Sequence, residues 1–150
     1  MYSILLSLHN VFRWAVLLAA LWAVYRFVTG WLGRRQFTSA DASASKFYTI
    51  SLDVQFLIGL ILLFVSPLIQ TMFADFGGSM KVPELRRIGM EHTILMLAAV
   101  TLGHIGGAMA KKNTDDVTRF KKGSIFFILS LVALLAGIPW WRGIAGAAFE

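Results

Sequence analysis

The sequence contains no cysteine, and only 15% of its 150 residues are charged. The absence of cysteine excludes disulfides, iron–sulfur clusters, thiolate metal sites, covalently attached c-type haem and cysteine nucleophiles. A soluble domain usually carries about 25% charged residues, so the low charge argues against an ordinary water-soluble domain. Instead, 57% of the residues are hydrophobic and 13% are aromatic, a composition that also excludes intrinsic disorder.

Long apolar segments account for this composition. A helix needs roughly 20 apolar residues to cross a hydrocarbon core of about 30 Å, and four segments meet this condition: 4–32, 47–73, 88–110 and 123–138. Their short connections predict an all-α, single-domain, polytopic membrane protein whose four helices form an up-down-up-down bundle. Ser66 and Pro67 predict a kink near the end of the second span, and we expect Pro139 to end the fourth.

The net charge of +6 comes mainly from basic residues that flank the spans, which predicts contact with a lipid bilayer and not with nucleic acid. Eight of these residues lie after the first and third spans, namely Arg34, Arg35, Lys46, Lys111, Lys112, Arg119, Lys121 and Lys122. Four lie on the opposite side, namely Lys81, Arg86, Arg87 and Arg142. The richer side is expected to be cytoplasmic, so both termini should face outward.

Aromatic residues near the ends of the spans support this orientation. Trp31 and Tyr48 lie near the expected inner interface, and Trp140 and Trp141 lie near the outer one. Because aromatic side chains are enriched at both membrane interfaces, we expect these four to act mainly as anchors.

Two histidines occur at matching depth. His9 lies about five residues into the first span and His92 about four residues into the third, and both spans begin on the outer side. At 1.5 Å per residue, both imidazoles lie roughly 6–8 Å below the same surface. Two neutral imidazoles facing each other across a bundle are able to ligate a haem iron from both sides. We expect Glu91 or Asn10 to accept the second ring N–H of a ligating histidine.

The surrounding residues fit a macrocycle. Mostly small side chains follow each histidine on its helix face and are expected to leave space for a flat ring: Val16, Ala20, Ala23, Met96, Ala99 and Gly103. Four outer arginines are candidates for binding the haem propionates, because the guanidinium fork binds carboxylates bidentately: Arg13, Arg86, Arg87 and Arg142. Met96 is an alternative ligand. Helix packing, hydrogen bonding across helices and snorkelling explain the same residues, so haem, a quinone or other small ligand, and a structural role all stay open.

A second polar group lies near the inner ends of the helices and comprises Arg26, Asp53, Gln55 and His104. Arg26 and Asp53 lie at similar depth, so we expect them to form an ion pair with His104 nearby. The alternative is a proton or quinone site on the cytoplasmic side. We do not expect His104 to bind a second haem, because it lies about 120° around the helix from His92 and the chain has only three histidines.

Four short stretches resemble small four-helix membrane proteins labelled cytochrome b-like, which are common among Bacteroidota and related bacteria. These stretches are residues 7–14 (SLHNVFRW), 52–55 (LDVQ), 91–92 (EH) and 137–140 (GIPW), and the length and helix order agree over most of the chain. The resemblance implies a b-type haem with axial histidines, which on this chain are His9 and His92. It also implies a location in the bacterial inner membrane.

Together these features predict a membrane-bound b-type cytochrome that carries electrons through one bis-histidine haem near the outer face. We expect it to work with a quinone or as a subunit of a larger respiratory or photosynthetic complex, rather than as a stand-alone enzyme. The alternative is a cofactor-free accessory subunit of a larger membrane complex. A carrier or channel built on Arg26, Asp53 and His104 is disfavoured, because the sequence shows no inverted repeat or broken helix of the kind found in transporters.

Overall fold

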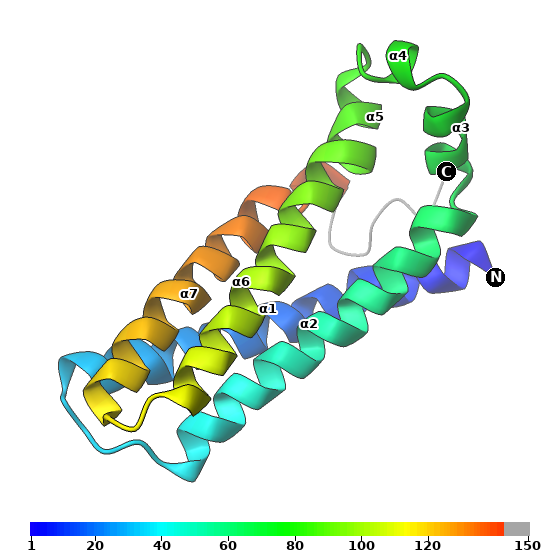
Figure 1. Ribbon diagram of the computed structural model, residues 1–150. Helices are drawn as coiled ribbons and strands as arrows, with labels where there is room; N and C mark the ends of the chain where they lie inside the picture. Colours follow the sequence, from blue (N-terminus) through cyan, green and yellow to red (C-terminus); the bar gives the residue numbers. More distant parts are fainter. Residues whose placement is uncertain (143–150) are drawn as a thin grey trace.

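The computed structural model describes residues 1–142, with Arg142 described only in its backbone, and the described chain is built from helices. Four long helical segments form the body of the molecule (Figure 1). They are α1 (Tyr2–Leu32), α2 (Ser39–Val65), a third segment made of α5 (Pro83–Arg86), the π-helical turn η1 (Arg87–Glu91) and α6 (His92–Lys112), and α7 (Asp116–Gly137). The shorter helices α3 (Pro67–Ala74) and α4 (Phe76–Ser79) connect α2 to α5, and the 3-10 turn η2 (Trp140–Arg142) follows α7.

The long helices run alternately up and down, as the sequence predicts. Helix α1 packs against α2 and α7, and α6 packs against the same two helices (Figure 1). Helices α1 and α6 therefore face each other across the diagonal of the bundle. Any group held between them lies on the bundle axis, where ligand sites of helix bundles are usually built.

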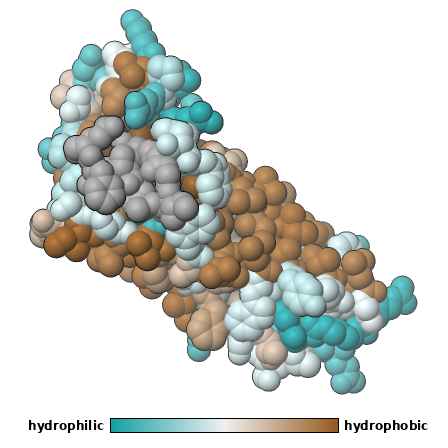
Figure 2. Space-filling model, turned by 180° about the vertical axis from the view of Figure 1, so that it is seen from behind, coloured by the Kyte–Doolittle hydropathy of each residue, from teal (hydrophilic) through white to brown (hydrophobic). Residues whose placement is uncertain are grey.

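All four long segments are apolar and long enough to cross a membrane: Tyr2–Leu32, Ser39–Val65, Pro83–Lys112 and Asp116–Gly137. Many of their large hydrophobic side chains point outward, including Leu18, Leu57 and Leu97. Figure 2 shows the result on one face, where hydrophobic surface covers the middle of the molecule and hydrophilic surface lies toward its two ends. The chain is therefore an all-α, four-helix membrane protein.

The helix bounds differ from the predicted spans where local chemistry overrides hydropathy. Helix α2 begins at Ser39, because Thr38 and Asp41 form a capping box at its start. It ends at Val65 instead of bending, since Pro67 lacks a backbone donor and Ser66 takes an extended conformation (φ −75°, ψ 122°).

The fourth helix begins at Asp116, seven residues earlier than its predicted apolar span. Its cap is Asp115, whose carboxylate accepts a hydrogen bond from the backbone N–H of Thr118. Hydrogen bonds from the side chain and from the backbone N–H of Thr118 lower the pKa of Asp115 below its ordinary value. Three basic residues assigned to the preceding loop therefore lie on α7: Arg119, Lys121 and Lys122.

The core of the inner half is aromatic. Phe27 of α1 makes edge contacts with Phe120 and Phe127 of α7, with ring centroids 5.7 and 4.9 Å apart. Glycine makes these contacts possible, because a Cβ on Gly123 would lie 2.4 Å from the ring of Phe27 and one on Gly30 would lie 2.4 Å from that of Phe120. The helices therefore approach closely at this end.

Tyr48 is not an interfacial anchor, contrary to the prediction. Its side chain is fully buried, and its hydroxyl lies 2.6 Å from Ser130 Oγ. Ser130 in turn donates to the carbonyl of Ala99 at 2.6 Å, so its single proton is used and Tyr48 is the donor of the first bond. This chain of hydrogen bonds joins α2, α7 and α6 inside the bundle.

The predicted ion pair between Arg26 and Asp53 is wrong. Arg26 Nε donates instead to Asp41 at 2.8 Å, and Arg35 donates to both carboxylate oxygens of Asp41 at 2.7 Å. These hydrogen bonds raise the pKa of Arg35. The carboxylate of Asp41 is completely buried beneath the two guanidinium groups. The sequence interpretation missed it because the apolar segment begins only at Phe47, which left Asp41 outside the predicted span.

This cluster gives a prediction about stability. Asp41→Asn keeps the size of the side chain but leaves Arg26 and Arg35 without their counter-ion. Because the two arginines keep 27% and 31% exposure, we expect a loss of about 2–3 kcal/mol, at or below the low end of the roughly 3–5 kcal/mol for a fully buried pair. The free energy of unfolding should be measured by denaturant titration in mixed micelles with circular dichroism.

Asp116→Asn is the control for this measurement. It loses only a 3.6 Å pair with Arg119 in which both side chains are partly exposed, so it should cost less than about 1 kcal/mol. Equal losses for the two variants would contradict a stabilising role for the Asp41 cluster.

Candidate cofactor site

The structure brings the two outer histidines together across the diagonal of the bundle. His9 projects from α1 and His92 is the first residue of α6. Their ring centroids lie 6.1 Å apart, and the ring planes are inclined by 73°. The π-helical turn η1 immediately precedes His92, and such turns occur frequently at functional sites. The matched depth read from the sequence thus corresponds to direct proximity.

Both imidazoles line a cavity at the outer half of the bundle. Its atom-free volume is about 1000 Å³, a figure that includes the parts open to the surroundings. Aliphatic side chains form most of the wall, and the polar lining includes Asn10, Arg13 and Gln55. A neighbouring hollow of about 560 Å³, also lined by both histidines, extends along α2 and α6 beside Phe56 and Val100.

The orientation of His92 is fixed by the backbone of α7. Its Nδ1 lies 2.8 Å from the carbonyl oxygen of Gly137, and a carbonyl only accepts hydrogen bonds, so Nδ1 carries the proton. In the neutral imidazole this leaves a lone pair on Nε2. A histidine that ligates a metal usually has its other ring nitrogen bonded in this way.

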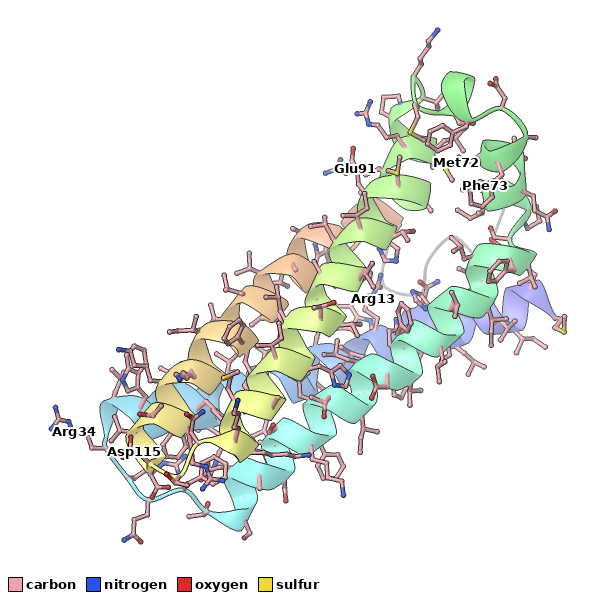
Figure 3. All side chains as sticks on the ribbon, in the orientation of Figure 1. Arg13, Arg34, Met72, Phe73, Glu91 and Asp115 are labelled. Carbon is pink, nitrogen blue, oxygen red and sulfur yellow. The ribbon has the colours of Figure 1, made fainter. Side chains whose placement is uncertain are left out.

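Glu91 does not accept this proton, contrary to one expectation from the sequence. Its carboxylate binds Arg86 at 3.0 Å, on the side of the third segment that faces away from α2 (Figure 3). Asn10, the other expected acceptor, is buried and lines the cavity.

The contact between His9 and α2 depends on Gly59. A Cβ at this position would lie 3.2 Å from His9 Cε1, so the missing side chain gives the imidazole its space. Gln55, one turn earlier, donates from Nε2 to the backbone carbonyl of His9 at 3.0 Å. Two buried atoms at this contact, His9 Nδ1 and Gln55 Oε1, have no hydrogen-bond partner among the described residues.

Gln55 therefore belongs to the outer cavity and not to the inner polar group in which the sequence analysis placed it. Residues Asp53 and His104 of that inner group pair with each other at 2.7 Å on the outside of the bundle, where both are about half exposed. Arg26 lies elsewhere, with Asp41. The expected inner cluster is thus divided among three places.

The four candidate arginines also separate. Arg13 is buried and lines the cavity, and Figure 3 shows it between α1 and the third segment. Arg86 is bound to Glu91, and the guanidinium of Arg87 lies 4.7 Å from the ring centroid of Trp141; neither is part of the described cavity lining. The side chain of Arg142 lies outside the described residues.

The small residues below the histidines pack helices rather than leaving space. Ala20, Ala23 and Ala99 are completely buried in the core, and a Cβ on Gly103 would lie 2.4 Å from Leu52 Cδ1. The other two residues of the expected space, Val16 and Met96, do line the cavity. The remaining wall comes from the outer end of the bundle, including Tyr2, Ser66, Ile69 and Ile88. The sequence thus placed the cavity too deep.

The ligand count limits which metals fit. No group of three or more His, Asp or Glu side chains suited to a metal ion occurs in the described part of the chain, whereas structural zinc sites need four ligands. A haem brings four nitrogens of its own and needs one or two axial ligands from the protein. With metal–nitrogen distances of about 2 Å, two imidazoles on opposite sides of one metal have ring centroids about 6 Å apart. The 6.1 Å separation fits this arrangement.

Comparisons with known proteins add no relative. No protein-family model matches this sequence, and no curated protein and no solved structure shows a significant similarity to it. Any functional proposal for this chain therefore rests on its cavity and the side chains that line it.

The contact with Gly137 predicts the tautomer of His92. In cofactor-free protein, His92 should carry its proton on Nδ1 because the carbonyl accepts a hydrogen bond there. NMR spectra of protein labelled with ¹⁵N-histidine distinguish a protonated ring nitrogen from an unprotonated one by chemical shift. For His92 we expect a protonated Nδ1 and an unprotonated Nε2. A proton found on Nε2 would contradict the described geometry and remove the basis for ligation through that atom.

Proposed function

We propose that this protein is a membrane-bound b-type cytochrome that holds one haem b between His9 and His92. The observation that carries the proposal is the pair of imidazoles on diagonally opposed helices, 6.1 Å apart, in one cavity. Haem supplies reversible one-electron chemistry at its iron, and the protein sets ligation, burial and local charge.

His9 and His92 are the proposed axial ligands. The carbonyl of Gly137 holds His92 with Nε2 available, and Gly59 gives His9 its position beside α2. Because these contacts come from α7 and α2, all four long segments help to place the two rings. Aliphatic side chains form most of the wall beside the two rings, which suits the apolar faces of a haem.

Arg13 is the proposed partner of a haem propionate. It is 7% exposed and lies one turn after His9 on the same helix. A guanidinium binds carboxylates through paired donors, and burial strengthens the attraction between opposite charges. This proposal carries over one of the four arginines predicted from the sequence. Arg86 and Arg87 are engaged elsewhere.

We further propose a place in the bacterial inner membrane, with both termini and the haem on the periplasmic side. Its support is the excess of Lys and Arg on the opposite side of the chain. A haem near one surface does not carry electrons across the whole bilayer by itself. The proposed role is therefore electron exchange with a quinone or within a larger respiratory or photosynthetic complex.

Single histidine variants test the axial ligands. We expect His9→Ala and His92→Ala each to abolish the low-spin, six-coordinate spectrum of the dithionite-reduced protein, since each removes one axial nitrogen. His104→Ala is the matched control and should keep the wild-type haem content per protein. Circular dichroism and gel filtration check that each variant is folded. A colourless wild type from haem-replete cells, or full haem retention in both variants, would contradict the proposal and favour a cofactor-free subunit.

Gln55 is the proposed positioning residue for His9. Its Nε2 donates to the backbone carbonyl of His9, and its Oε1 and His9 Nδ1 are both buried without a hydrogen-bond partner among the described residues. We expect Gln55→Leu to weaken haem binding about tenfold, because the backbone that carries the His9 ring loses this contact.

Titration of apoprotein with haem measures this effect. The control is Gln70→Leu, because Gln70 also donates to a backbone carbonyl but is exposed on α3. Gln55→Leu should in addition shift the midpoint potential, which a general loss of stability would not do in folded, haem-loaded protein. Equal affinity and potential for the two variants would remove Gln55 from the site.

A further inference from the structure

Asp53 and His104 form a polar pair on the exposed surface of the bundle. The pair lies within the membrane-spanning part of α2 and α6. His104 Nε2 lies 2.7 Å from Asp53 Oδ1, and the two side chains are 47% and 50% exposed. Asp53 follows Lys46 by seven residues and His104 precedes Lys111 by seven. At 1.5 Å per residue, both groups lie about 10 Å from the charged inner end.

The surface around this pair is hydrophobic. Val54, Leu57 and Leu97 are 38%, 58% and 55% exposed on the same two helices. Ionisable side chains in such a surface are costly in lipid and nearly always face protein or a water-filled cavity. Only long side chains such as lysine and arginine reach the interface from this depth, and aspartate and histidine are too short. The pair therefore indicates a surface that protein covers in the membrane.

We propose that the face formed by α2 and α6 around Asp53 and His104 binds a second copy of this chain. Each copy presents one acidic and one basic side chain side by side. A two-fold axis through this patch sets the imidazole of each copy against the carboxylate of the other, so the patch complements itself. A different subunit would need a matching pair of its own, whereas a second copy already has it.

The neighbouring residues on α6 leave room for such a contact. Thr101 and Ala108 lie one turn before and one turn after His104, and both are exposed. Small side chains at a membrane helix surface let another helix approach closely, so that polar groups at the centre of the contact are shielded from lipid. The hydroxyl of Thr101 bonds to the carbonyl of Leu97 within its own helix and adds no unpaired donor to the interface.

This inference is independent of the proposed haem. Neither Asp53 nor His104 lines the cavity that holds His9 and His92. Loss of haem and loss of the dimer are therefore separate results, and each is measured without the other.

Cysteine crosslinking in membranes tests the proposal, and the chain lacks any native cysteine. Ala108→Cys places a thiol at the proposed interface. Leu32→Cys is the matched control, because Leu32 is 74% exposed near the same inner end on α1, the helix diagonally opposite α6. With a short bis-maleimide reagent, we expect at least tenfold more dimer-sized product from Ala108→Cys than from Leu32→Cys.

A second substitution tests the role of the polar pair. In the Ala108→Cys background, Asp53→Asn and His104→Gln should each lower the crosslinked fraction at least fivefold. Light scattering in mild detergent should change from dimer to monomer, while circular dichroism stays unchanged. Equal crosslinking at Ala108→Cys and Leu32→Cys, a product containing a different polypeptide, or a monomeric wild type in both measurements would overturn the proposal.

Discussion

Polar groups inside a hydrocarbon core have no water to bond with, and this constraint decides which side chains meet in the bundle. Tyr48, Ser130 and the carbonyl of Ala99 satisfy one another across three helices. Asp41 forms salt bridges with Arg26 and Arg35 at the inner end. The first set joins three helices and the second joins the end of α1 to the start of α2, so the need for partners also determines how the helices are aligned.

The exceptions to this rule are informative because two of them share one place. His9 Nδ1 and Gln55 Oε1 are buried without a hydrogen-bond partner among the described residues, and both residues line the outer cavity. Ser124 Oγ, by contrast, is unpartnered within the packed core. Buried polar atoms without hydrogen-bond partners that occur together in a cavity usually mark a functional site. Here they lie beside the two facing histidines.

The sequence predicted those features that depend on one helix at a time. Apolar length gave the four spans, and residue counting along α1 and α6 gave His9 and His92 the same depth. Pairing between helices was harder to predict, because depth does not specify which faces meet. Arg26 and Asp53 share a depth but not a face, so each found another partner. Hydropathy alone also placed the start of the second span at residue 47 instead of Ser39. Asp41 therefore lay outside the predicted span.

Two local signals in the sequence could have improved the prediction of the site. Gly59 and Gln55 are four residues apart on α2, so they share the helix face that meets His9. Gly137 is the last residue of α7 and lies two residues before Pro139. Its carbonyl oxygen lies within hydrogen-bond distance of His92 Nδ1. The π-helical turn before His92 gave no such signal, since its extra residue depends on packing in three dimensions.

The inner half of the bundle is tightly packed, whereas the outer half contains the cavity. At the inner half, Gly123 and Gly30 leave space for the rings of Phe27 and Phe120 between the neighbouring helices α1 and α7, and that space is filled. At the outer half, Ser66 and Pro67 stop α2 at Val65, and the chain turns into α3.

Helix α3 packs back onto the third segment, where the side chain of Met72 occupies the space beside Gly89. The cavity is lined by residues on both sides of this break, including Leu63 before it and Ile69 after it. A straight second helix would carry residues 66–73 past the histidines and could not wrap α3 over them. The break at Pro67, predicted only as a kink, is therefore the feature that lets a tightly packed bundle keep a cavity at the level of its two facing imidazoles.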